Sequence, residues 1–290
     1  LIKKYAQLLK LETRAITEPD EVFEEPSSLC VLDHKLNKPV SIGKTDLGNA
    51  LSIRSGIERS VELIKEKKAA GLVTCPINKW ILKKGTSFNF EGHTDFLSYL
   101  DGQTKNAIMM LGNNAGFRVS PVTVHVPLSK VPKLLSEELI RHNILTLNHH
   151  LISECGIKRP KILVTGLNPH AGENGTLGSE ESSIIKPAVE SLKALGLNIF
   201  GPVSADSAFT AHNRNKYDAF VSMYHDQALI PFKTIDFENG ANITLGLSFV
   251  RTSPNHGIAL DIAGRNIADP ASLIFSIREA NRICGQRALN

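Results

Sequence analysis

Short apolar runs alternate along the chain with longer segments in which apolar residues recur every three or four positions. The runs predict six strands, at Gly71–Cys75, Ala107–Leu111, Val119–His125, Lys161–Leu167, Ala219–Tyr224 and Asn242–Val250. An alternation of strands with helical segments is typical of an α/β protein, in which helices cover a central sheet.

Four segments with helical period lie between or after these runs, and each presents one apolar face. Residues 51–67, 136–155 and 182–195 form the first three, and Asp269-Pro270 opens the fourth. Gly156 and Gly196 end the second and third. The faces that we expect to point inward are, in chain order, Ile53, Ile57, Val61 and Ile64; Ile140, Ile144, Leu147 and Leu151; Ile185, Val189 and Leu192; and Leu273, Ile274, Ile277 and Cys284.

The composition of the chain argues against several classes of function. The 290 residues include 33 Lys and Arg against 29 Asp and Glu, a net charge of +4 that is too small and too scattered to indicate a nucleic-acid partner. No run approaches the roughly 18–20 apolar residues of a membrane span. The four cysteines lack the close spacing of zinc or redox motifs, and they suit free thiols in a reducing cytosol. We therefore expect a cytoplasmic protein that binds neither nucleic acid nor membrane.

Polar residues concentrate directly after the apolar runs. Ligands of open α/β sheets bind at the carboxyl ends of strands, so these clusters are candidate site residues. The clusters are Glu91–Asp95, Thr123–His125, Asn168–Glu173, Ser204–Ser207 and Tyr224–Gln227.

Three histidines, His125, His170 and His225, each follow a predicted strand. A fold that brings these strand ends together could place them around one transition-metal ion, since neutral imidazole binds such metals. The alternative is three unrelated histidines in polar loops, because no local HxxxH spacing is present.

Lys233, Asn242 and Arg251 are spaced nine residues apart, and the two cations could bind phosphate or carboxylate. The alternative for them is ordinary surface charge. The Gly- and Asn-rich segment 168–179 could also present backbone N–H groups to an anion, although it matches no nucleotide-binding motif.

Several of these strings together resemble the 4-hydroxythreonine-4-phosphate dehydrogenase family of pyridoxal phosphate biosynthesis. They are EGHTDFL at 91–97, GLNPHAGE at 166–173, GPVSADS at 201–207, MYHDQAL at 223–229, NITLGLSFVRTS at 242–253 and the segment His256–Gly264. They cover roughly residues 70–290 in the family's order. The departure is at the front, where the family's first strand and its Gly-Pro-rich turn have no counterpart.

The resemblance implies a two-lobed α/β/α fold like that of isocitrate and isopropylmalate dehydrogenases, with the active site in the cleft between the lobes. We expect residues 1–92 and 236–290 to form the cofactor-side lobe, and residues 93–235 to carry the metal ligands and dimer contacts. The resemblance also implies a homodimer with shared active sites. A divalent metal (zinc, magnesium or cobalt) would be held by His125 and His170 of one subunit and by His225 of the other.

Carried over by position, the family's substrate-binding residues fall on His93, Thr94, Asp206, Lys233, Asn242 and Arg251. The reaction is an NAD-dependent oxidation and decarboxylation, in which a base accepts the substrate's hydroxyl proton. Asp226 and Lys233 are both candidates for this base, and the sequence does not choose between them. Three alternatives remain. They are a paralogous dehydrogenase of a phosphorylated sugar acid such as 4-phosphothreonate or 4-phosphoerythronate, a three-histidine metal hydrolase without a nucleotide, and a non-catalytic metal-binding module.

The segment His256–Gly264 resembles the loop that holds the adenosine half of NAD in isocitrate and isopropylmalate dehydrogenases. We expect the dinucleotide to lie along His256 and Gly257, with its adenine near Asp269. NAD should be preferred, because NADP usually needs a dedicated cation beside the ribose and this segment offers only Arg265.

Overall fold

The computed structural model describes residues 2–24, 28–102 and 107–289. The strands are β1 Thr13–Ile16, β2 Leu29–Leu32, β3 Gly71–Val73, β4 Ile108–Asn113, β5 Arg118–Thr123, β6 Lys161–Thr165, β7 Asn198–Val203, β8 Ala219–Tyr224, β9 Gly240–Leu245 and β10 Val250–Pro254. The α-helices are α1 Ile2–Leu8, α2 Ala50–Lys65, α3 Lys79–Gly85, α4 His93–Asp101, α5 Val131–Leu134, α6 Glu137–Ser153, α7 Lys186–Ala194, α8 Ala205–Ala208, α9 Ala211–Lys216, α10 His225–Ile235 and α11 Ala271–Leu289.

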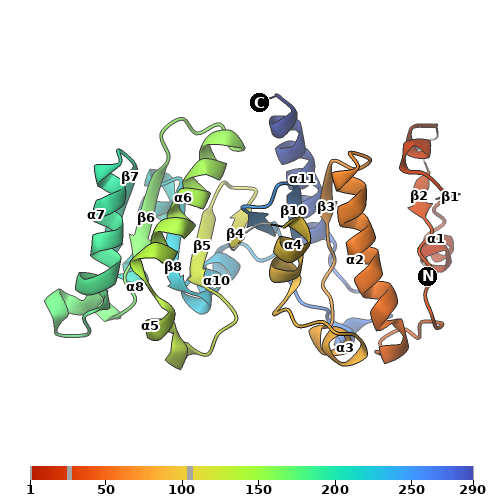
Figure 1. Ribbon diagram of the computed structural model, residues 1–290, viewed down its shortest axis with the longest axis horizontal. Coiled ribbons are helices and arrows are strands. Elements are labelled where there is room, and N and C mark those ends of the chain that lie inside the picture. Colours follow the sequence, from red (N-terminus) through yellow and green to blue (C-terminus); the bar gives the residue numbers. More distant parts are fainter. Residues whose placement is uncertain (1, 25–27, 103–106, 290) are drawn as a thin grey trace.

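Eight strands form one mixed sheet in the order β3-β10-β9-β4-β5-β8-β6-β7 (Figure 1). Strands β5, β8, β6 and β7 are mutually parallel, whereas β9 is antiparallel to both of its neighbours. The sheet therefore has a parallel half and a mixed half, which meet where β4 pairs with β5. Because all four strands of the parallel half run the same way, the segments that follow them emerge at one edge.

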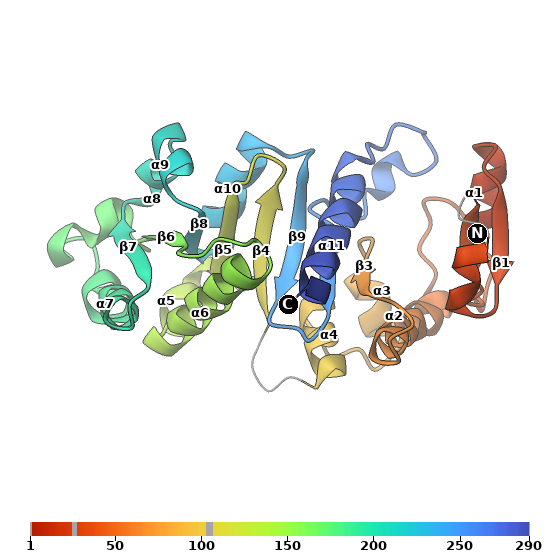
Figure 2. The same cartoon turned by 90° about the horizontal axis from the view of Figure 1, so that it is seen from above.

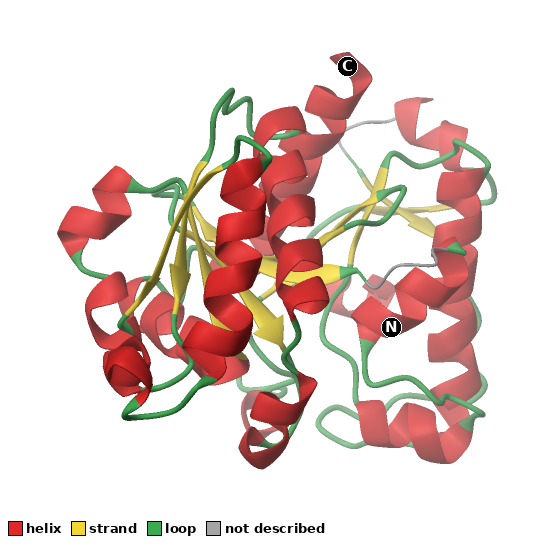
Figure 3. Cartoon of the chain, turned by 60° about the vertical axis from the view of Figure 1, so that its left-hand side comes forward, coloured by secondary structure: helices red, strands yellow, loops and turns green. Residues whose placement is uncertain are grey.

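Helices cover both faces of the sheet, so the predicted α/β class is confirmed (Figures 2 and 3). On one face α6, α7 and α11 bury the largest apolar cluster, which contains Ile144, Val189 and Ile283. On the other face α10 packs Phe232 against Phe117 and Phe220. None of the described helices combines the length and the apolar character that a membrane span requires.

The predicted strand Asn242–Val250 is wrong as a single element. Residues 246–249 interrupt it, and the chain reverses there, so β9 and β10 pair as antiparallel neighbours. Gly246 has a φ of +89°, a left-handed conformation that glycine adopts without strain. The apolar run hides this reversal because Leu247 and Phe249 are buried in a separate cluster with Val61 and Leu97.

The expected inward faces of the second and third helices are confirmed, with all seven side chains fully buried. In α2 the face is only partly correct, since Val61 is buried but Ile53 is 37% exposed. In α11 it is mostly wrong, because Ile274 and Ile277 are exposed at 42% and 51%, although Cys284 does pack against the core. The buried residues of this helix are the small Ser272, Ser276 and Ala280, together with Ile283. Thr252 donates to the carbonyl of Ser276 at 2.8 Å, which requires a close approach of helix and strand.

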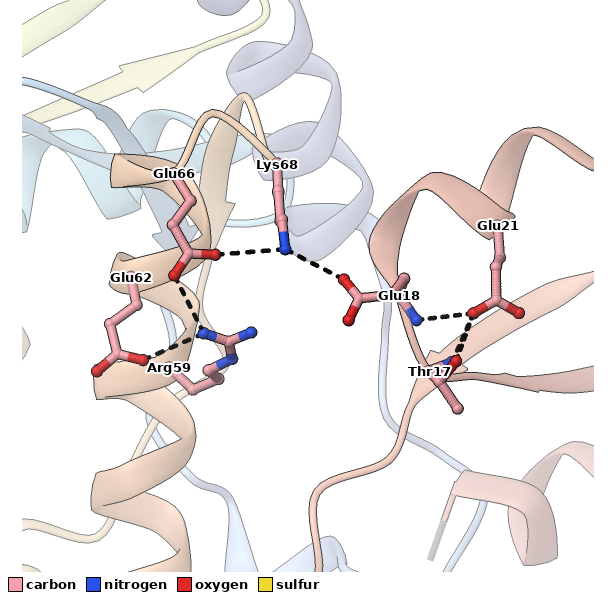
Figure 4. Close-up of polar contacts among 7 residues, drawn as sticks. All are labelled: Thr17, Glu18, Glu21, Arg59, Glu62, Glu66 and Lys68. Atoms are coloured by element: carbon pink, nitrogen blue, oxygen red, sulfur yellow. Dashed lines mark hydrogen bonds and ion pairs between the residues drawn. The ribbon is translucent and has the colours of Figure 1, made fainter.

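The N-terminal segment, with α1 and the parallel pair β1–β2, lies at the end of the molecule beside α2 (Figures 1 and 2). Lys68 links the two by ion pairs of 3.1 Å to Glu18 and 3.6 Å to Glu66 (Figure 4). Arg59 extends the network to Glu62 on α2. Exposed ion pairs of this kind contribute little stability individually.

Candidate active site

A cavity of about 270 Å³ opens where β4 and β5 separate. The two strands pair only at Leu111–Val119 and Gly112–Arg118, and beyond these pairs their other ends diverge. The cavity is lined by Ile108 and Met109 from β4 and by Pro121 and Val122 from β5. It therefore lies at the junction between the parallel half and the mixed half of the sheet.

Four of the predicted site residues line this cavity: His93, Thr94, His125 and Asn242. His93 and Thr94 begin α4, whereas His125 follows β5 and Asn242 lies in β9. Lys79, at the start of α3, also lines the cavity and was not singled out from the sequence. Lys79 lies against Gly92, with its Nζ atom 3.5 Å from the position of a Cβ at that residue.

Arg251 lies in β10, in the mixed half of the sheet, and is buried, with 3% of its surface exposed. Its Nη1 donates to Thr244 Oγ1 at 2.9 Å and its Nη2 donates to Thr74 Oγ1 at 2.8 Å. Its Nε atom and the Oδ1 atom of Asn242 are buried without a hydrogen-bond partner in the described chain. Burial lowers the pKa of the guanidinium to about 10, so the group is still charged at neutral pH. A buried cation paired only with hydroxyls is a strong candidate for binding an anion.

The positive charge of Arg251 acts on the nearby His93 ring and affects its pKa. Burial, assisted by the positive charges of Arg251 and Lys79, lowers the pKa of His93 to about 3. The ring is therefore neutral at physiological pH and can both donate and accept a hydrogen bond.

The three candidate metal ligands follow three neighbouring parallel strands. His125 follows β5, His225 opens α10 after β8, and His170 follows β6. The His125 and His225 rings come together, with centroids 5.7 Å apart, because Thr123 of β5 pairs directly with Tyr224 of β8.

His170 lies one strand further along, in a left-handed turn with a φ of +52°. Among the described residues, no three His, Cys, Asp or Glu side chains are placed to hold a metal ion. Within one chain the ring of His125 thus lies beside that of His225, the residue that the family resemblance assigns to the partner subunit. The three-histidine site and its division between subunits remain predictions.

The paired histidines nevertheless fit a metal. Burial, assisted by the charges of Lys79 and His225, lowers the pKa of His125 to about 4, and neutral imidazole is the form that coordinates metals. His225 Nδ1 lies 2.8 Å from Asp226 Oδ1, which orients the ring and leaves Nε2 for a ligand. A carboxylate bound to the second nitrogen is the usual support of a metal-binding histidine.

Gln227 and Glu181 hold the segments that follow the parallel strands in place, and only the structure identifies these roles. Gln227 accepts from the Met223 N–H at 2.7 Å and donates to the Gly166 carbonyl at 2.8 Å, which joins the start of α10 to the end of β6. The buried Glu181 accepts from the backbone N–H groups of residues 167 and 168, both at 2.7 Å. It thereby holds the turn that carries His170. Gly172 is required in this turn, since a Cβ there would lie 2.6 Å from the Glu181 carboxylate.

The other predicted substrate and catalytic residues lie outside the cavity. Asp226 and Lys233 share an exposed face of α10, along a shallow depression that also includes His225. Lys233 Nζ lies 5.4 Å from the centre of the Phe237 ring. Asp206 is exposed at the start of α8, where a 2.6 Å hydrogen bond from Ser204 and, more weakly, the charge of His170 lower its pKa.

The predicted cofactor segment is an irregular, mostly exposed stretch after β10. No described atom lies within 4 Å of a Cβ built at Gly257, so nothing in the fold itself requires glycine there. Asp269 Oδ1 accepts from the Ala271 N–H at 2.7 Å and so supports the start of α11. The roles of His256, Gly257 and Asp269 toward NAD remain predictions.

Comparison with known proteins decides the family. Residues 1–280 match the family described as pyridoxal phosphate biosynthetic protein PdxA. The chain belongs to this family. The 4-hydroxythreonine-4-phosphate dehydrogenase of Roseobacter denitrificans is 46% identical over 92% of this chain and 82% of its own length. The enzyme of that name from Paracoccus denitrificans is 43% identical over 94% and 85%.

Solved structures of the PdxA family share the fold. The crystal structure of 4-hydroxythreonine-4-phosphate dehydrogenase from Klebsiella pneumoniae superimposes with a TM-score of 0.82 at 35% identity, over 94% of this chain and 83% of that one. The family and fold inferred from the sequence strings are therefore confirmed. The boundaries of the two lobes are untested, although β9 of one expected lobe pairs along its whole length with β4 of the other.

Proposed function

We propose that this PdxA-family chain is an NAD-dependent 4-hydroxythreonine-4-phosphate dehydrogenase, which oxidises and decarboxylates its substrate in pyridoxal phosphate biosynthesis. Within the described residues, the buried Arg251 has no carboxylate partner and the Oδ1 atom of Asn242 has no hydrogen-bond partner. These two groups, together with the cavity lined by His93 and Thr94, carry the proposal. Such a set binds a small anion that also carries hydrogen-bonding groups. The names of the relatives supply the identity of that anion.

In this proposal the chain's own residues orient the substrate and move one proton. Arg251 binds an anionic group of the substrate bidentately, and the neutral His93 and Thr94 hydrogen-bond its polar groups. Lys233 accepts the hydroxyl proton. We assign the proton to Lys233 because the Asp226 carboxylate already holds the His225 ring. When bound, NAD accepts the hydride and a divalent cation supplies Lewis-acid polarisation of the substrate oxygen.

His125, His170 and His225 are the proposed ligands of that cation, and a homodimer would complete the set. Replacing His125 in one subunit and His225 in the other tests the sharing. If His225 acts in the partner's site, a mixed dimer of the two inactive variants has one intact site and regains part of the activity. If both histidines serve their own chain, as their 5.7 Å spacing would allow, exchange restores nothing. The four cysteines are free, which agrees with a reducing, cytoplasmic location.

A second candidate is a dehydrogenase of a phosphorylated sugar acid, because the same cation and histidine set would hold 4-phosphothreonate or 4-phosphoerythronate. The deciding experiment measures NADH formation at 340 nm from each compound, with and without added zinc, magnesium or cobalt. Metal-dependent NADH formation from 4-hydroxythreonine-4-phosphate alone supports the proposal. Turnover of only the sugar acids identifies the paralogous activity, and hydrolysis without NADH formation would identify a metal hydrolase.

A further inference from the structure

A cluster of ionisable side chains joins the end of α6 to α11, outside the cavity described above. His150 Nδ1 lies 2.6 Å from Glu154 Oε2, and these side chains are only 3% and 9% exposed. Arg287 of α11 contacts the same carboxylate, with Nε donating to Oε1 at 2.7 Å. Arg282, which precedes Arg287 on the same helix, donates to the Glu154 carbonyl at 2.5 Å.

Cys155 completes this cluster. Its backbone N–H donates to the His150 carbonyl at 3.2 Å, which turns the chain back beside the imidazole. Arg282 Nη2 lies 3.8 Å from the Cys155 sulfur. Both ring nitrogens of the buried His150 lack a hydrogen-bond partner of normal geometry in the described chain. Cys155 itself is partly exposed.

The charges around the sulfur favour its ionised form. Burial alone would raise the pKa of Cys155, but its contact with His150 and the positive charges of His150, Arg118 and Arg282 outweigh burial and lower it. Burial alone would likewise lower the pKa of His150, and its contacts with Cys155 and Glu154 raise it instead. Glu154 and Arg287 are the remaining charged groups that face the pair.

We propose that Cys155 is a reactive thiolate, with His150 as its proton donor, and that it is a site of oxidation by small peroxides. The thiolate sulfur attacks one peroxide oxygen, an S–O bond forms, and the O–O bond breaks. The sulfur is oxidised by two electrons to a sulfenic acid and the peroxide is reduced. The departing hydroxide takes the proton of the His150 imidazolium and leaves as water, and His150 regains a proton from solvent. Thiolates in electropositive, partly exposed surroundings are the cysteines most susceptible to this chemistry.

Cys284 serves as an internal comparison. It packs against the same apolar cluster as Cys155 and is also partly exposed. Its thiol, however, donates to the Ala70 carbonyl at 3.3 Å, and burial raises its pKa. Both cysteines are partly exposed, and they differ in the polar groups that contact the sulfur: Arg282 at Cys155 and the Ala70 carbonyl at Cys284.

The test labels the folded full chain with iodoacetamide over a range of pH and follows each cysteine by peptide mass spectrometry. The midpoint pH of labelling should be lower for Cys155 than for Cys284 by about one unit or more, which corresponds to about tenfold more thiolate at neutral pH. A pulse of hydrogen peroxide followed by dimedone should then label Cys155 as the sulfenic acid before it labels Cys284. Equal midpoints for the two cysteines, or no dimedone adduct at Cys155, would overturn the proposal.

Two variants identify the cause of this reactivity. His150→Gln should raise the labelling midpoint of Cys155, whereas His149→Gln, at the exposed neighbouring position, should leave it unchanged. If His150→Gln fails to fold, Arg282→Gln on the more exposed α11 surface provides the second measurement, and it should raise the midpoint as well. An unchanged midpoint in a folded His150→Gln protein, or in Arg282→Gln where the histidine variant does not fold, would show that the charged cluster does not activate the thiol.

Discussion

Replacing Arg251 by Met separates an anion-binding role from a structural one. Methionine has a similar length and no charge, so it fills much of the same buried space. The change removes the two hydrogen bonds of 2.9 and 2.8 Å to Thr244 and Thr74. It also removes the guanidinium N–H groups that we propose to bind the substrate. Because the native cation has no carboxylate partner in the described chain, the variant leaves no opposite charge stranded in the interior.

The expected change in stability is small. Burial lowers the pKa of Arg251 to about 10, and this shift corresponds to about 3 kcal/mol of unfavourable free energy for the buried charge. Removing the charge recovers that cost, whereas the two hydroxyls left without a donor lose about 1 kcal/mol each. The free energy of unfolding should therefore change by no more than about 1–2 kcal/mol.

The expected loss of activity is large. A hydrogen bond from a charged group is worth about 1.5–3 kcal/mol, so a bidentate contact contributes about 3–6 kcal/mol, or about 10²- to 10⁴-fold in kcat/KM. Arg251→Lys keeps the charge but loses the planar fork, and it should fall between the wild type and the Met variant.

Urea unfolding and steady-state NADH formation provide the two measurements. Arg59→Met serves as the control, because Arg59 is an exposed arginine whose pair with Glu62 is 3.3 Å long. Wild-type kinetics in folded Arg251→Met would refute anion binding by this residue. A loss of stability well beyond about 2 kcal/mol would instead show that the guanidinium is needed for the fold.

Four further predictions concern other parts of the molecule. His170→Ala should lose bound divalent metal, measured by elemental mass spectrometry, while its circular dichroism spectrum is unchanged; full metal content would remove His170 from the site. Lys233→Met should lower kcat much more than it raises KM, and equal effects on both would indicate binding and not proton transfer. Arg265→Ala should leave a preference for NAD over NADP intact; a wild-type preference for NADP that this change abolishes would show that Arg265 binds the 2′-phosphate. Glu154→Gln should destabilise the fold by about 3–5 kcal/mol at neutral pH, because it leaves the buried His150 and the partly buried Arg287 without their carboxylate. Burial alone would raise the pKa of the Glu154 carboxyl, but its cationic partners lower it below 4.5, so its contribution is present above that value and is lost as pH falls through the folded pKa. The unfolding free energies of wild type and Glu154→Gln should therefore converge in acid, and a gap that persists at low pH would contradict the electrostatic explanation.

The sequence by itself determined the elements whose apolar residues repeat with one clear period. The four side chains expected on the inner face of α6, Ile140, Ile144, Leu147 and Leu151, are all buried, because residues spaced three or four positions apart lie on one side of a helix. The strings GLNPHAGE and MYHDQAL likewise identified the family, since they preserve residues that the chemistry and the turns both need. These features are local, and local spacing is what a sequence displays directly.

Tertiary structure alone decided features that depend on contacts between distant segments. The reversal at Gly246 lies inside a continuous apolar run, because Leu247 and Phe249 are buried in a different cluster from β9. The inward face of α11 consists of small and polar residues, since Thr252 of the sheet bonds to the helix backbone there.

The same holds for the site. The sequence indicates that Arg251 could bind an anion, but only the pairing of β10 with β3 and β9 buries it between two threonines. His125 and His225 lie close together because β5 and β8 are adjacent in the sheet. In the sequence, the two residues are far apart, since β6 and β7 come between them. Residue types and their local spacing are written in the chain, whereas burial, which sets the cost of a charge and the pKa of an imidazole, is a property of the packed sheet and its helices.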